Sequence, residues 1–221
     1  LATGDGNTVS DYVSRVWTAL SLLAMGELDA ARPYAFFLRD RAERRGTPRP
    51  TVAFSLMLNT ILSGLEGDWT AAREYSDRSL ELVPLSPELL TPRALLEHET
   101  GGSAQGQVYL ERLLELRRRA GEKGGRPAGM TSIAIARIAR ITGDPDLLEV
   151  AEAAAEELLS DRSGNPYIAM SAKHSLSLVA VPKGDRSAAE EHYGYLLGQR
   201  GAMSMAGPLD RILGLLSQTM G

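Results

Sequence analysis

Glycines recur along this chain where one apolar segment ends and the next begins. They lie 34 to 42 residues apart, at Gly26, Gly67, Gly101, Gly143, Gly184 and Gly221. Helices commonly end on a residue in the left-handed conformation, which glycine adopts at little cost. Asp, Glu or Ser soon follows most of these glycines, where an acceptor oxygen can satisfy the first N–H groups of another helix. The pattern predicts helices joined in pairs by tight glycine turns.

A second set of positions keeps the same period. A small residue stands seven positions before every one of these glycines: Ala19, Thr60, Ala94, Ala136, Ser177 and Gly214. Composition alone would place six small residues in this way in about one chain in a thousand. Small side chains let two helices approach closely, so we expect a close helix crossing at each position.

The segments between the glycines have the apolar spacing of helices. We predict A helices, each before a glycine, over 10–25, 51–66, 86–100, 129–142, 167–182 and 207–220. The B helices that follow are predicted over 28–45, 69–83, 104–120, 145–160 and 186–199. One hairpin cannot bury its own apolar face, whereas stacked hairpins share a core. The expected fold is all-α: a right-handed α-solenoid of antiparallel hairpins with about 11 helices, forming one repeat domain over 1–221.

The stretch "GDWTAAREYSDRSLELVP" (67–84) resembles the second half of a tetratricopeptide repeat, through its Gly-Asp-aromatic start and Ala72, Tyr75 and Pro84. "GELDAARPYA" and "GDRSAAEEHY" are looser versions. Most units are longer than the roughly 34 residues of that family. In the length of its units, and in the stretch "LERLLELRRRAG", the chain resembles the C-terminal repeat regions of bacterial LuxR-type transcription activators and nucleotide-cyclase-type signalling ATPases. The resemblance implies a protein–protein interaction scaffold in bacterial signal transduction or transcription regulation.

Composition excludes several classes of function. The 24 Lys and Arg against 28 Asp and Glu give a net charge of −4, so there is no general attraction to nucleic acid or an anionic membrane. The chain has no cysteine, which excludes disulfides and thiolate metal sites and fits a cytoplasmic protein. No apolar run approaches the roughly 20 residues of a membrane helix.

The two ends suggest a part of a larger protein, because the chain lacks an initiator Met and stops after the A helix of a sixth unit. The stretch "LDRILGLLSQTM" has no B helix to cover its apolar stripe, which includes Leu213 and Leu216. We therefore expect this stripe to be exposed and to favour a homodimer through the C-terminal helix.

Catalytic motifs are not found. The clusters "GDG" and "GEKGG" lack the Lys-Ser/Thr of a phosphate-binding loop, and the three histidines stand on different hairpins without metal-ligand spacing. "EHE" at 97–99 turns adjacent side chains to different helix faces. We read the arginines at 117–119 as surface residues that complement a helix C-terminus. We expect no enzyme, no cofactor and no bound metal.

A candidate binding groove follows from the repeat. Residues 3, 6, 10 and 13 before each glycine share the A-helix face that tetratricopeptide-like stacking turns inward. In the first two hairpins these are apolar and could equally form core: Val13, Val16, Leu20, Leu23, Phe54, Met57, Ile61 and Gly64. Later hairpins place Glu88, Thr91, His98, Arg137, Arg140, His174 and Arg211 there. We hypothesise that Arg137, Arg140, His174 and Arg211 form a basic floor, with Glu88 and His98 in the same groove.

Such a floor would receive a carboxylate or acidic segment of a protein, a peptide or another module of the parent chain. A competing interpretation pairs the arginines with acidic B helices of neighbouring hairpins. For the function of the whole chain, the alternative is a structural spacer or self-association module without a specific ligand. An enzyme of unknown type is a third and more remote reading.

Overall fold

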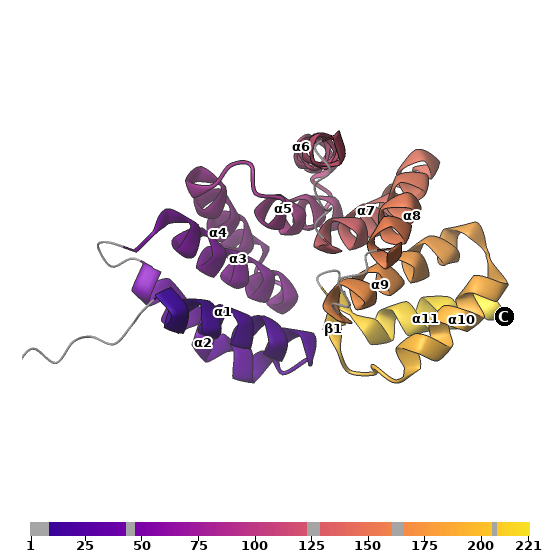
Figure 1. Ribbon diagram of the computed structural model, residues 1–221, viewed down its shortest axis with the longest axis horizontal. Coiled ribbons are helices and arrows are strands. Elements are labelled where there is room, and N and C mark those ends of the chain that lie inside the picture. Colours follow the sequence, from indigo (N-terminus) through magenta and orange to yellow (C-terminus); the bar gives the residue numbers. More distant parts are fainter. Residues whose placement is uncertain (1–8, 43–46, 123–128, 161–165, 205–206) are drawn as a thin grey trace, which may run out of the picture. The chain divides into compact units, whose positions relative to one another are not determined.

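The computed structural model describes residues 9–42, 47–122, 129–160, 166–204 and 207–221 (Figure 1). Over these ranges the chain is all-α, with eleven helices and one short strand pair. Unit 1, Leu1–Pro84, contains α1 (Val9–Ala24), α2 (Leu28–Ala42), α3 (Arg49–Glu66) and α4 (Trp69–Leu82). Unit 2, Leu85–Gly221, contains α5 (Pro87–Glu99), α6 (Ser103–Glu122), α7 (Gly129–Thr142), α8 (Pro145–Ser160), α9 (Pro166–Lys183), α10 (Arg186–Leu197), β1 (Met203–Ser204), β2 (Gly207–Pro208) and α11 (Leu209–Met220).

The glycine turns are confirmed. The five glycines between the A and B helices have positive φ angles of 62° to 83°, the left-handed conformation that closes a helix. Aspartates cap the helices that begin after three of them. The carboxylates of Asp68 and Asp185 each accept a hydrogen bond of 3.0 Å from a first-turn N–H, and Asp144 accepts two, of 3.0 and 3.2 Å.

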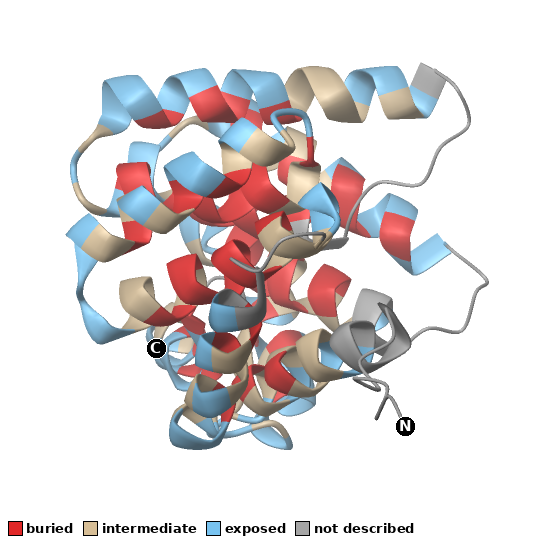
Figure 2. Ribbon diagram, turned by 90° about the vertical axis from the view of Figure 1, so that its left-hand side faces the viewer, coloured by how far each residue is buried: buried red, intermediate tan, exposed pale blue. Residues whose placement is uncertain are grey.

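Successive hairpins stack within each unit. In unit 1, α3 packs against α1 and α2; in unit 2, α5, α7, α9 and α11 form a row in which each A helix contacts the next. Figure 2 shows the buried positions on the faces that the helices turn toward one another. Of the six small residues, five are buried at these crossings: Ala19, Thr60, Ala94, Ala136 and Ser177. Gly214 departs from the pattern, because it is exposed and open space surrounds its Cα.

Most of the apolar A-helix positions that the sequence left open between groove and core belong to the core of unit 1. Leu23 and Met57 are buried, and Val16, Leu20 and Ile61 pack against a cluster of Ala19, Leu23, Ala31, Ala35, Leu38, Leu58 and Leu62. The buried Asn59 amide donates hydrogen bonds to the carbonyls of Ala35 (3.2 Å) and Ser55 (2.8 Å), which ties α3 to α2. These contacts favour the core interpretation. The side chain of Val13 lies outside the described residues.

The last helix begins later than predicted. We expected it to start at residue 207, but Gly207 has a φ of 103° and Leu209 is the first helical residue. A left-handed glycine cannot belong to a right-handed helix, and here it lies in β2, which pairs antiparallel with β1. The two-residue strands carry no alternation long enough to be read from the sequence.

The expected exposure of the C-terminal stripe is wrong. Leu213 is 5% exposed and Leu216 is 0% exposed. The helix α11 packs against both α10 and α9, and these two helices cover this face. The exposed apolar stripe from which we expected a homodimer is therefore not present on α11.

Candidate anion-binding site

Three arginines and one glutamate from the A helices of unit 2 lie close enough for their charges to interact. Arg137 and Arg140 stand one turn apart near the end of α7, Glu99 is the last residue of α5, and Arg211 lies in the first turn of α11. We call this group the arginine cluster. It brings together three of the residues predicted for the groove, from two helices separated in the row by α9.

Arg137 forms the interior of the arginine cluster. Its Nε makes an ion pair with a carboxylate oxygen of Glu99, and only 8% of its side chain is exposed, compared with 28% for Glu99. On another side the backbone of β2 approaches it. A Cβ atom added at Gly207 would lie 2.9 Å from Nη1 of Arg137. Arg137 is thus held between the end of α5 and the strand pair.

Arg140 and Arg211 lie nearer to solvent. Arg140 is partly buried, and its buried Nε has no hydrogen-bond acceptor among the described residues. Arg211 is exposed. In the described part of the chain, no ion pair joins either arginine to a carboxylate. Glu99 interacts with Arg140 through its charge, without a direct bond.

Burial and neighbouring positive charges both lower the pKa values of Arg137 and Arg140. Burial lowers the pKa of Arg137 most strongly; the charge of Glu99 opposes this, whereas those of Arg211 and Arg140 lower the pKa further. Burial and the charge of Arg211 also lower the pKa of Arg140, and Glu99 counteracts them in part. Both side chains stay protonated, because a guanidinium does not lose its proton in proteins. The cluster therefore holds positive charge that a ligand could neutralise.

Three of the predicted groove residues lie outside the cluster. His98 turns toward α6 of its own hairpin, where a Cβ at Gly106 would overlap its ring. His174 is fully buried, with its Nε2 3.4 Å from Oε1 of Gln199 in the turn after α10. Glu88 accepts a 2.6 Å hydrogen bond from the hydroxyl of Ser86 at the start of α5. Their side chains meet their own hairpin rather than a shared floor.

The two histidines are neutral parts of the interior. Burial lowers the pKa of His174 to about 4, against a small opposing effect of its hydrogen bond to Gln199. Burial likewise lowers the pKa of His98, while the backbone of Gly106 and the charge of Glu97 raise it. Neither histidine adds positive charge to a binding surface near neutral pH.

The residues Glu97, His98 and Glu99 have three different environments, as expected for neighbours on a helix. Glu97 forms a buried ion pair of 2.9 Å with Arg93, with side chains only 5% and 7% exposed. His98 packs on α6, and Glu99 reaches Arg137. Neither ion pair is among the pairings expected from the sequence. The four-residue spacing of Arg93 and Glu97 was a readable signal, whereas nothing local linked Glu99 to Arg137.

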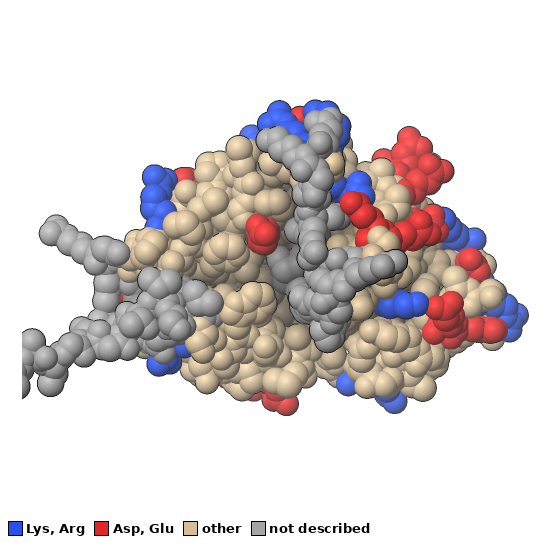
Figure 3. Space-filling view, viewed as in Figure 1, with Lys and Arg blue, Asp and Glu red and all other residues tan. Residues whose placement is uncertain are grey.

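The competing interpretation, in which the arginines pair with acidic B helices, describes Arg137 only in part. Arg137 does belong to an ion pair, but its partner Glu99 lies on the neighbouring A helix. A B-helix pairing is found elsewhere, between Arg117 of α6 and Glu157 of α8, at 3.1 Å. Figure 3 shows basic side chains over α6 and acidic ones over α8.

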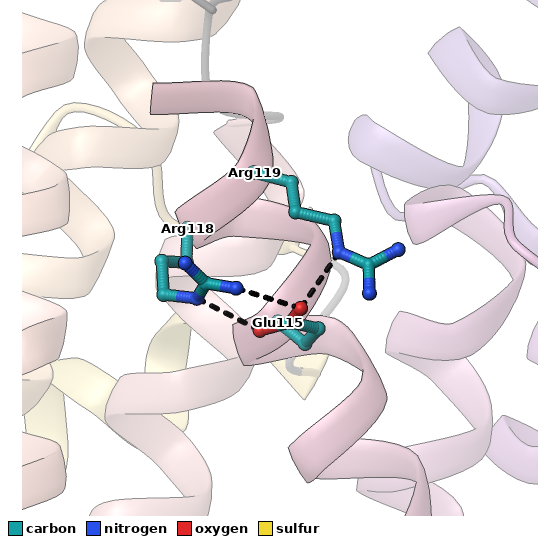
Figure 4. Close-up of polar contacts among 3 residues, drawn as sticks. All are labelled: Glu115, Arg118 and Arg119. Carbon is teal, nitrogen blue, oxygen red and sulfur yellow. Dashed lines mark hydrogen bonds and ion pairs between the residues drawn. The ribbon is translucent and has the colours of Figure 1, made fainter. Parts of the chain in front are cut away.

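The basic end of α6 differs from the arginine cluster because each of its three arginines is bonded to a carboxylate, Arg117 to Glu157 and the other two to Glu115. The exposed carboxylate of Glu115 accepts hydrogen bonds from Arg118 (2.8 and 2.9 Å) and from Arg119 (2.6 Å) (Figure 4). These bonds lower the pKa of Glu115 to about 2. Here the sequence predicted a solvated surface, and the local pairing agrees with that reading.

Within the described ranges, His, Asp and Glu side chains form no group of three or more placed to hold a metal ion. None of the helices described combines the length and apolar character needed to cross a lipid bilayer.

No family model, no curated protein and no solved structure matches this chain. A function has to be inferred from the charges and contacts of the chain's own residues.

Proposed function

We propose that this chain is a non-catalytic protein-interaction module that binds an acidic segment at the arginine cluster. The partner is a protein, a peptide or another module of the parent chain. The resemblance of residues 67–84 to a tetratricopeptide repeat supports a scaffold role. With the longer repeats, it favours a place in a cytoplasmic bacterial signalling or transcription-regulatory protein.

The observation that carries this proposal is the charge imbalance of the arginine cluster. The carboxylate of Glu99 pairs with Arg137 and acts on Arg140, and the positive charge of Arg211 adds to those of both arginines. Bringing like charges together in a partly buried place costs free energy, and Arg137 and Arg140 already lie partly or wholly out of water. An acidic group bound to Arg140 and Arg211 would recover part of that cost through charge-assisted hydrogen bonds.

A structural spacer would have no need for such an arrangement. Its surface charges would be paired or evenly solvated, as they are around Glu115 at the end of α6. The arginine cluster instead leaves the Nε of Arg140 buried without an acceptor among the described residues. This difference between two basic regions of the same unit favours a binding function.

The proposal can be tested with a fluorescein-labelled peptide of about ten glutamates and fluorescence anisotropy at low salt, where the Debye length is long. The unmodified chain should bind saturably. The double variant Arg140→Glu/Arg211→Glu should bind about tenfold or more weakly, because each charged hydrogen bond contributes roughly 1.5–3 kcal/mol. Arg211→Glu alone, at an exposed position, should show part of the loss without disturbing the fold.

Arg186→Glu is a matched control, because Arg186 is an exposed arginine of unit 2 paired with Glu190. It changes the net charge as Arg211→Glu does and should bind like the unmodified chain. Circular dichroism melts confirm that each variant is folded. An equal loss of binding in the Arg186→Glu and Arg211→Glu variants would show that only net charge matters, and unchanged binding in both would show that Arg211 is not part of the site. Absence of saturable binding would favour the spacer.

A further inference from the structure

The arginine cluster carries two more positive charges than negative ones. Arg137, Arg140 and Arg211 each contribute one positive charge and Glu99 one negative charge. A single carboxylate would leave one positive charge uncompensated beside the buried side chain of Arg137. A dianion would neutralise the cluster. We propose that Arg140 and Arg211 form a seat for a dianionic phosphoryl group on a phosphorylated protein segment.

The seat belongs to Arg140 and Arg211 because Arg137 is already engaged. Glu99 pairs with Arg137, and the backbone of Gly207 covers its Nη1. Arg137 therefore acts as a positioning residue, which adds positive charge to the cluster without contacting the ligand. The Nε of Arg140 is buried, and no described residue accepts a hydrogen bond from it. Arg211 is exposed. These two guanidinium groups come from α7 and α11, so a bound group would link the two helices.

A phosphoryl group suits this pair in charge and in shape. It carries about −1.5 to −2 charges at neutral pH and presents three strong acceptor oxygens. Arginine binds phosphate through two parallel N–H groups, and the three oxygens of a phosphoryl group offer acceptors to more than one arginine. The net charge of −4 disfavours an extended polyanion such as nucleic acid. We therefore choose a single phosphoryl group on a protein segment.

This inference rests on the proposed function, because it specifies the acidic group that the same site takes. The experiment compares three labelled peptides of one neutral sequence, carrying phosphoserine, glutamate or serine at the centre. At pH 7.5 the phosphoserine peptide should bind about tenfold more tightly than the glutamate peptide, and the serine peptide should not bind. Inorganic phosphate should compete with the phosphoserine peptide. Arg211→Glu should abolish this binding, and Arg186→Glu should leave it unchanged.

A pH series separates the two kinds of ligand. The second phosphate pKa is about 6, so binding of the phosphoserine peptide should weaken several-fold from pH 7.5 to pH 5.5. Binding of the glutamate peptide should change little, because a glutamate carboxyl has a pKa of about 4.3. Among the described residues, the charges that act on Arg137 and Arg140 are those of Glu99 and of the arginines themselves, and the arginines do not titrate in this range. Melting curves at both pH values confirm that the chain stays folded.

The outcomes distinguish the two proposals. Equal affinity for the phosphoserine and glutamate peptides, or a phosphoserine affinity that does not change with pH, overturns the phosphoryl seat and leaves acidic recognition standing. If neither these peptides nor the polyglutamate peptide binds, both proposals fail. If Arg211→Glu unfolds the chain, Arg211→Gln replaces it, and that variant should lose phosphoserine binding while it keeps the melting temperature of the unmodified chain.

Discussion

Gly207 is the residue at which backbone conformation and the candidate site meet. Its φ of 103° lies where side chains other than that of glycine are strained, and its Cα faces the guanidinium of Arg137. A methyl group there would have to displace Nη1, and Arg137 has little room to move because it is buried and paired with Glu99. The identity of this residue therefore matters both to the strand pair and to the cluster.

We expect Gly207→Ala to lower the free energy of unfolding by about 1–2 kcal/mol through its backbone conformation alone. Displacement of Arg137 should add to this loss. Urea denaturation followed by circular dichroism measures the effect. The control is Gly198→Ala, because Gly198 has a φ of −70° and its Cβ would meet open space. A Gly207→Ala variant as stable as the Gly198→Ala variant would show that Gly207 does not hold Arg137 in place.

Residue-scale environments were also the hardest to predict. The sequence placed Arg137, Arg140 and Arg211 on one face, and the structure brings these three together. The sequence also placed His98 and His174 on that face, but in the structure the side chain of each histidine turns toward the second half of its own hairpin. Small rotations of a helix decide whether a side chain points across the row or toward the B helix, and the repeat period does not specify that rotation.

At the scale of the helices, the repeat pattern was a good guide. Most predicted boundaries agree with the observed ones to within two residues, because glycine turns and aspartate caps act over only a few residues. The small residue seven positions before the glycine marks a crossing only where another helix packs against it. Ala136 on α7 meets this condition, whereas Gly214 on α11 does not.

This contrast leads to opposite expectations for two similar substitutions. Ala136→Leu should overpack the crossing and lower the free energy of unfolding by roughly 1–3 kcal/mol. Gly214→Ala should raise it by roughly 0.5–1 kcal/mol, because glycine disfavours a helix interior and nothing lies near its Cα. Thermal and urea unfolding measure both changes. If Ala136→Leu melts like the unmodified chain, the repeat register assigned to α7 is incorrect.

At the scale of the whole molecule, the three histidines of the chain are all in one unit. His98, His174 and His192 all lie in unit 2, and burial lowers the pKa of each. A lowered histidine pKa means that the unfolded chain binds protons more readily than the folded one. The resulting stability is fully present above pH 6.5 and is lost as the pH falls toward the folded-state value, which is about 4 for His174.

We expect acid to destabilise the chain well before its carboxylates titrate. His174 alone should cost about 2 kcal/mol between pH 7.5 and pH 5, since each pKa unit corresponds to about 1.4 kcal/mol. Urea unfolding at these two pH values tests this. The carboxylates of Glu115 and Glu191 have lowered pKa values, so their contributions are lost only at lower pH. His174→Gln should remove most of the 2 kcal/mol; an unchanged pH dependence would contradict the assignment.

The sequence by itself determined the all-α class, most of the helix boundaries and the glycine turns, and it indicated that acceptor side chains follow these turns. These features depend on backbone preferences and hydrogen bonds between residues close in the chain, so a single sequence contains them. The right-handed winding of the repeats remains a prediction of the same pattern.

Only the tertiary structure decided the partners of the charged and apolar side chains. It paired Arg137 with Glu99 of the preceding hairpin, turned His98 onto Gly106, and buried Leu213 and Leu216 under α10 and α9. Each of these outcomes depends on how helices from different hairpins are rotated and spaced when they pack. Burial and charge are properties of that packing, so residues distant in the sequence acquire them only when the chain is folded.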